Sequence, residues 1–223
     1  MGLLFFETLY TAFTSMFQAL FVFPNDMRMV VKERQSGMYR LSAFYLARTM
    51  SDVPMDCMIP TFFIIVVYFM AGLRLTVSAF VCNWLTVIIS LLTAQGVGLL
   101  LGAGVTNVKT AQTMASIIIL TLMLSGGFYV AYVPVWISWV KYLSMISYCY
   151  NILLHIEFQG RTIYACPNGP DSCVPVDSQE ALATSKHPDD PVYLEVGILL
   201  LMLFGLRVAV YLILNRKTKV KQN

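Results

Sequence analysis

The stretch LTVSAFVCNWLTVIISLLTAQGVGLLLGAGVTNV, residues 75–108, contains no charged residue over 34 positions. An apolar run of about 18 residues or more with few charges is typical of a membrane-spanning helix. We expect one span in this run, from about residue 80 to residue 103. Gly98 and Gly102 lie in it at the GxxxG spacing that lets two helices approach closely. The run therefore predicts a helical membrane protein.

The composition of the whole chain supports this class. Apolar residues make up 58% of the 223 residues and charged residues only 12%, about half the charged share of a soluble domain. This excludes an ordinary soluble enzyme. The net charge of +3 is small and scattered, so we expect no nucleic-acid partner.

Apolar segments on both sides of the first run predict about five spans in all. The other four are expected at residues 2–23, 45–73, 111–130 and 196–214. We expect the first helix to stop at Pro24, and the helix of the second span to begin near Leu41 with Pro54 and Pro60 inside it. An aromatic stretch after residue 131 predicts interfacial or re-entrant helices. The fold class is an all-α integral membrane domain over residues 1–215.

The segments between the spans predict the orientation. A charged, helical connector is expected at residues 24–44, a long external loop at 131–195, and a basic tail at 216–223. Ten Lys and Arg residues fall on the side of the connector and the tail, against four on the other side. Because cytoplasmic loops carry the excess of Lys and Arg, we expect the connector and the tail in the cytoplasm.

Some charged residues lie in or beside the expected spans. Arg48, Asp52 and Asp56 follow one another at a spacing of four, which places them on one helix face and allows Arg48 to pair with Asp52. Arg207 lies inside the last span. Its side chain either extends to the membrane surface or pairs with a neighbouring helix.

The chain contains none of the usual catalytic or metal-binding motifs. No GxxxxGK[ST], GxSxG or HExxH sequence occurs, so we expect no catalytic residue and no cofactor in this chain. The five cysteines include no CxxC pair, so no metal site is expected either. Cys166 and Cys173 are expected on the oxidising outer side, where they form either a disulfide or two free thiols.

Several sequence motifs resemble a known family. The stretch VKERQSGMYRLSAFYLARTMSDVPMD at 31–56 looks like the coupling region of ABC transporters of the G subfamily, the white/brown half-transporters, in their plant form. Further matches follow in the same order as in that family: YFMAGL at 68–73, AQGVGLLLGA at 94–103, SGGFYV at 125–130, VPVWISWVKYLS at 133–144 and GLRVAVYLIL at 205–214. The resemblance covers almost the whole chain and corresponds to the second to sixth membrane helices of an ABC-2 type transmembrane domain.

The resemblance implies a function that this chain would share with other parts. Family members carry a nucleotide-binding domain that binds ATP and Mg²⁺, and its motifs are absent from this chain. The implied protein is an exporter of an amphipathic or hydrophobic small molecule, and the plasma membrane is its implied location. Two identical or two different half-transporters would form the dimer.

The resemblance also implies roles for individual residues. In the connector, the residues that would transmit closure of the nucleotide-binding domains are Glu33, Arg34, Gly37, Tyr39 and Arg40. The substrate cavity would be lined by Phe6, Tyr10, Phe13, Ile119 and Leu122, with Phe128 as its upper gate. Residues 6, 10 and 13 share one helix face. The alternative is that these side chains only pack against lipid or neighbouring helices.

A rival hypothesis gives the chain a different function. It would then be a truncated, non-transporting remnant that dimerises with full-length half-transporters and regulates them. A nucleotide-binding domain encoded upstream would favour the exporter over this remnant.

Overall fold

The computed structural model describes residues 2–35, 41–105, 107–126, 140–158, 163–165, 174–176 and 192–220. The helices are α1 (Gly2–Gln35), α2 (Leu41–Met70), α3 (Val77–Gly104), α4 (Val108–Ser125), α5 (Val140–Leu143), α6 (Met145–Phe158) and α8 (Val192–Val220). Two short strands, β1 (Ile163–Ala165) and β2 (Val174–Val176), pair antiparallel. Long helices make up most of the described chain, so the predicted helical membrane fold is confirmed.

Four of the described helices are long and apolar enough to cross a membrane, namely α2, α3, α4 and α8. They correspond to four of the five expected spans. The first expected span lies in α1, which is not among these four helices. Its buried face carries polar side chains, including Glu7, Thr8, Thr11 and Ser15, and these lower its mean hydropathy.

Helix α1 is longer than we expected. We expected its helix to stop at Pro24, but the helix continues to Gln35, so this boundary is wrong. Proline removes one hydrogen bond from a helix, and the remaining bonds of a 34-residue helix carry it past that position. The first part of the expected connector is therefore helical, as predicted, but it is continuous with α1. Helix α2 begins at Leu41, as expected, and runs through both Pro54 and Pro60.

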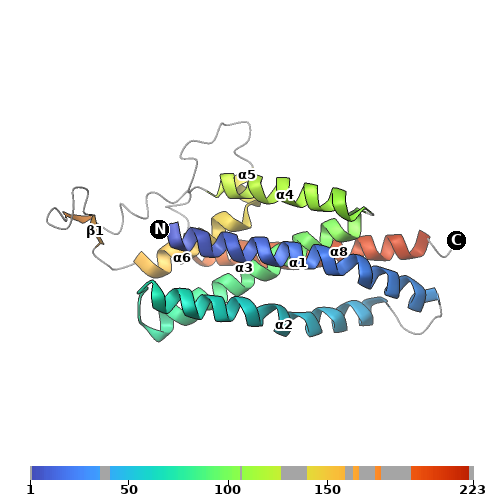
Figure 1. The fold of residues 1–223 in the computed structure, drawn as a ribbon, viewed down its shortest axis with the longest axis horizontal. Helices are drawn as coiled ribbons and strands as arrows, with labels where there is room; N and C mark the ends of the chain where they lie inside the picture. The colour runs from blue at the N-terminus through green and yellow to red at the C-terminus, as the bar shows by residue number, and fades with distance from the viewer. Residues whose placement is uncertain are drawn as a thin grey trace.

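Helix α3 is the central element of the bundle and packs against α1, α2, α4, α6 and α8. In Figure 1, α1 lies between α4 and α2. The close packing of α1 on α3 depends on Gly98. A Cβ at that position would overlap the carbonyl oxygen of Met16 and lie 3.1 Å from Cβ of Ala19. The predicted role of Gly98 in helix packing is thus confirmed.

Helix α6 lies inside the bundle. Every side chain from Met145 to Leu154 is buried, and the helix packs against α1, α3, α4 and α8. Glu157 near its end accepts a 3.1 Å hydrogen bond from the backbone N–H of Arg74. This bond joins α6 to the turn between α2 and α3, in which Gly72 adopts a positive φ of 63°.

Candidate functional site

An apolar pocket of about 250 Å³ lies between α1 and α4. It is lined by Phe6, Leu9, Tyr10, Phe13, Ile119, Leu120 and Met123. The aromatic residues of α1 lie one helical turn apart, so their rings follow one another along the helix. The rings of Phe6 and Tyr10 are stacked, with centroids 6.2 Å apart, and Tyr10 contacts Phe63 of α2 at 4.5 Å.

The pocket has an open side. Phe6 and Phe13 are 57% and 47% exposed, whereas Ile119 is buried and closes the base of the pocket. The hydroxyl group of Tyr10 is the one polar group among the lining side chains, which otherwise consist of hydrocarbon and thioether groups. Such a surface binds apolar parts of a ligand by excluding water, and a single hydroxyl group provides a hydrogen-bonding position.

The structure brings together four of the five predicted cavity residues, namely Phe6, Tyr10, Phe13 and Ile119. Leu122 does not line the pocket. It is 6% exposed and belongs to the hydrophobic core. The hydroxyl group of Ser144 donates a 3.0 Å hydrogen bond to its backbone carbonyl oxygen.

Sequence reasoning missed three lining residues. Leu9 lies three positions after Phe6 and four before Phe13, and Leu120 and Met123 lie one and four positions after Ile119. The same helical spacing that grouped the aromatic residues could have identified Leu9 and Met123, whereas Leu120 is adjacent to Ile119 and does not follow that spacing from it.

The remaining predicted site residues fall mostly outside the described residues. Three residues of the connector lie outside the described residues, namely Gly37, Tyr39 and Arg40. The expected gate Phe128 and the two cysteines Cys166 and Cys173 also lie outside them. Glu33 and Arg34 lie in the last turn of α1, where the structure describes their helical backbone. Their proposed roles remain predictions.

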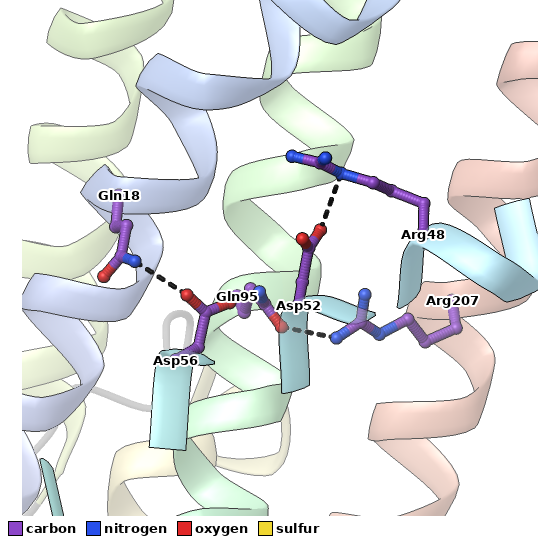
Figure 2. Close-up of polar contacts among 6 residues, drawn as sticks. All are labelled: Gln18, Arg48, Asp52, Asp56, Gln95 and Arg207. Atoms are coloured by element: carbon purple, nitrogen blue, oxygen red, sulfur yellow. Dashed lines mark hydrogen bonds and ion pairs between the residues drawn. The ribbon is translucent and has the colours of Figure 1, made fainter. Parts of the chain in front are cut away.

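A second group of residues, which we call the polar cluster, joins four helices (Figure 2). It consists of Gln18 on α1, Arg48, Asp52 and Asp56 on α2, Gln95 on α3 and Arg207 on α8. The carboxylate of Asp56 accepts hydrogen bonds from the side-chain amides of Gln18, at 2.7 Å, and Gln95. The carbonyl oxygen of Gln95 accepts a hydrogen bond from the guanidinium of Arg207.

The amide of Gln95 therefore bridges an anion and a cation. Its nitrogen donates to Asp56 and its oxygen accepts from Arg207, so both charges are satisfied without direct contact. The hydroxyl group of Tyr45 donates to the backbone carbonyl of Arg207 at 3.1 Å. This arrangement compensates charges that would otherwise be unfavourable inside a membrane domain.

Sequence reasoning predicted part of the polar cluster. Arg48 Nε lies 3.0 Å from Asp52 Oδ2, which confirms the expected ion pair. Arg207 pairs with a neighbouring helix, as one of the two alternatives proposed. The contacts of Gln18 and Gln95 were missed, because they join residues far apart in the sequence.

A second cavity of about 190 Å³ lies against the polar cluster. Its lining combines Gln18, Arg48, Asp52, Asp56 and Gln95 with Ala19, Val22, Phe23 and Leu99. Within the described residues, no group of three or more His, Cys, Asp or Glu side chains could hold a metal ion. These features define a polytopic membrane domain with an apolar pocket on one side of α1 and a charge-compensated polar cluster further along it.

Comparison with known proteins gives the family. The model of the ABC-2 type transporter family matches residues 1–158. ABC transporter G family member 22 of Arabidopsis thaliana is 41% identical over 215 residues, which cover 96% of this chain and 26% of the relative. G family member 14 of the same plant is 38% identical over 215 residues, covering 96% and 33%. The mouse broad substrate specificity ATP-binding cassette transporter ABCG2 is 33% identical over 169 residues, covering 74% and 25%.

The chain belongs to the ABC-2 type transporter family. The resemblance to plant members of the G subfamily is confirmed, and the chain is the membrane portion of a transporter. It spans about a quarter to a third of the length of these relatives.

Proposed function

We propose that this chain forms the translocation pathway of an ATP-driven exporter for amphipathic or hydrophobic small molecules. A nucleotide-binding domain, which binds ATP and Mg²⁺, would supply the energy. The observation that carries the proposal is the apolar pocket between α1 and α4, because four residues proposed for the substrate cavity line it together.

The chemistry of the pocket limits the class of substrate. It has exposed aromatic rings, a single hydroxyl group and no charged side chain among its lining residues. A ligand with a flat or flexible hydrocarbon body and few polar groups would be complementary to it. A small hydrated ion would find neither charged ligands nor carbonyl ligands there.

The size of the pocket supports a dimer. Its volume of about 250 Å³ is below the roughly 300–1,000 Å³ typical of a small-molecule site. Two copies, or two different half-transporters, that face each other through these open pockets would enclose a full-sized cavity. The exposed rings of Phe6 and Phe13 would then lie inside it, shielded from lipid.

The length of α1 supports coupling to the nucleotide-binding domain. Phe6, Tyr10 and Phe13 share one continuous helix with Glu33 and Arg34. In the proposed mechanism the connector, with Gly37, Tyr39 and Arg40, receives the closure of the nucleotide-binding domains on the cytoplasmic side. Movement of the cytoplasmic end of α1 would then change the shape of the pocket. The plasma membrane is the proposed location.

The test uses the complete transporter, including its nucleotide-binding domain, in inside-out membrane vesicles. ATP-dependent uptake is measured with three labelled probes: a sterol, a long-chain alcohol and a lipophilic amine. Burying an aromatic ring contributes roughly 1.5–3 kcal/mol, so Phe13→Ala should raise the half-saturating concentration of a transported probe about tenfold or more.

Phe21→Ala is the matched control. Phe21 lies on the same helix with the same 47% exposure as Phe13, but it does not line the pocket, so uptake should stay near that of the wild type. Equal effects of the two substitutions would refute the assignment of the pocket. Absence of ATP-dependent uptake of all three probes by the wild-type transporter would contradict the proposed substrate class.

A further inference from the structure

Glu7 is a carboxylate enclosed in the core of the membrane domain. It is 1% exposed, and neither of its carboxylate oxygens has a hydrogen-bond partner among the described residues. A buried isolated carboxylate is strongly unfavourable in its charged form. Its environment therefore decides whether the group is charged at all.

The residue next to Glu7 contacts neutral groups. The hydroxyl group of the next residue, Thr8, donates a 2.9 Å hydrogen bond to the carbonyl oxygen of Leu4 and lies 3.7 Å from Sγ of Cys149 on α6. Cys149 is fully buried. Glu7 and Thr8 are both buried in the bundle, in which α1 packs against α3 and α6.

No cation from the helices packed against α1 compensates Glu7. Helix α3 contains no charged residue. The one charged residue of α4 is Lys109. It lies about 25 Å along that helix from Gly126, and Gly126 marks the end of α4 that lies next to Phe5. The charged residues of α2 belong to the polar cluster, which meets α1 at Gln18, about 16 Å along α1 from Glu7.

On α6, Cys149 is the titratable residue that contacts Thr8, the residue next to Glu7. The other titratable residues of that helix are Tyr148, Tyr150, His155 and Glu157.

We propose that Glu7 is a proton-binding site inside the membrane domain. The folded bundle holds its carboxyl group as a neutral acid, and the packing of α1 against α3 and α6 depends on that proton. Release of the proton would leave a carboxylate without a counter-charge in the core, and water or a cation would have to enter to solvate it. The site would thereby make the packing of these three helices sensitive to pH.

The deciding experiment is infrared difference spectroscopy of the whole protein reconstituted in lipid vesicles. At neutral pH we expect the C=O stretch of a protonated carboxylic acid, absent in Glu7→Gln and displaced in Glu7→Asp. The matched control is Glu195→Gln. Glu195 is equally buried but accepts a 3.1 Å hydrogen bond from the amide of Asn151, and its substitution should leave the Glu7 band in place.

Two results would overturn the proposal. One is an identical carboxylic-acid region in the wild type and Glu7→Gln at neutral pH, because Glu7 would then be ionised. The other is a band at Glu7 that appears only after Na⁺ and K⁺ are replaced by choline, because a metal cation would then occupy the site.

A second measurement applies even if Glu7→Gln folds poorly. The unfolded chain releases a proton that the native state holds. The melting temperature of the wild type should therefore fall as the pH rises from the ordinary titration range of a glutamate to the pH at which the buried carboxyl group ionises. Glu7→Gln, which cannot release this proton, should show a smaller fall. If that variant does not fold, the band of the wild type must itself disappear as the pH rises. A band that is constant up to strongly alkaline pH would contradict a reversible proton site.

Discussion

Gln18 of α1 donates a 2.7 Å hydrogen bond to the carboxylate of Asp56 on α2, although the two residues are 38 positions apart. The same carboxylate also accepts a bond from Gln95 of α3, so one anion holds three helices together. Figure 2 shows Arg207 of α8 on the other side of Gln95. The polar cluster therefore depends on charge balance as much as on geometry.

A double-mutant cycle on Asp56 and Arg207 tests this balance. Arg207→Gln removes the cation that interacts with Asp56 through Gln95, and Asp56→Asn removes the anion. Each single change should destabilise the protein, and the double change should cost less than their sum by about 0.5–3 kcal/mol. Thermal or denaturant unfolding in detergent gives the change in the free energy of unfolding for the two single variants and the double variant.

The control cycle uses Arg216→Gln, because Arg216 is an exposed arginine on the same helix. Its effect should add to that of Asp56→Asn without coupling. Additive effects in the Arg207 cycle as well would mean that the two charges do not depend on each other.

Gly98 provides a test of helix packing. A methyl group there would overlap the backbone of Met16, so Gly98→Ala must separate α1 from α3 and should destabilise the protein by about 1–3 kcal/mol. Gly104→Ala is the matched change on the same helix, with no atom within 4 Å of the added Cβ, and it should be neutral or slightly stabilising. The melting temperatures of the two purified variants test whether Gly98→Ala is the less stable one. Equal decreases in melting temperature would contradict this expectation.

The hairpin of β1 and β2 makes a disulfide testable. Ala165 pairs with Val174, and the residues that follow Ala165 and precede Val174 in the sequence are Cys166 and Cys173. An antiparallel pairing extended by one residue would place the two cysteines opposite each other, at a Cα separation that a disulfide can span. We predict this bond, which would contribute roughly 2.5 kcal/mol by closing the loop.

Peptide mapping by mass spectrometry without reduction should recover the two cysteines in one linked peptide pair. Cys82, an exposed free cysteine of α3, serves as the internal control for alkylation and should be modified without reduction. Alkylation of Cys166 and Cys173 to the same extent as Cys82 would show two free thiols.

Coupling through the connector can be tested in the complete transporter. Replacing Glu33 with Gln, or Gly37 with Ala, should lower the amount of probe transported per ATP hydrolysed while surface expression stays unchanged. The reason is that these positions are proposed to transmit closure of the nucleotide-binding domains. Transport and ATP hydrolysis measured on the same vesicles give the ratio. An unchanged ratio in both variants would contradict the coupling role.

The sequence predicted those features that depend on local patterns. The absence of charge over residues 75–108 predicted α3, the spacing of Arg48 and Asp52 predicted their ion pair, and the helical spacing of Phe6, Tyr10 and Phe13 placed them on one face. Each of these three features follows from the hydropathy of one segment or from the spacing of residues along one helix.

Features that depend on tertiary contacts could not be predicted in this way. The burial of Leu122 depends on how α4 packs in the bundle, and the bridge formed by Gln95 requires α2 and α8 to meet beside α3. The continuation of α1 past Pro24 does not follow from the local rule that proline ends a helix, because the helix runs without interruption over 34 residues.

The continuity of α1 has a mechanical consequence. Tyr10 and Glu33 lie on one helix, separated by about 35 Å along its axis. If such a rod tilts as a unit by about 10°, its two ends shift by about 6 Å relative to each other, a distance comparable to one helical turn. In this way α1 would act as a lever, converting a small swing at its cytoplasmic end into a change in pocket width without any hinge inside the membrane.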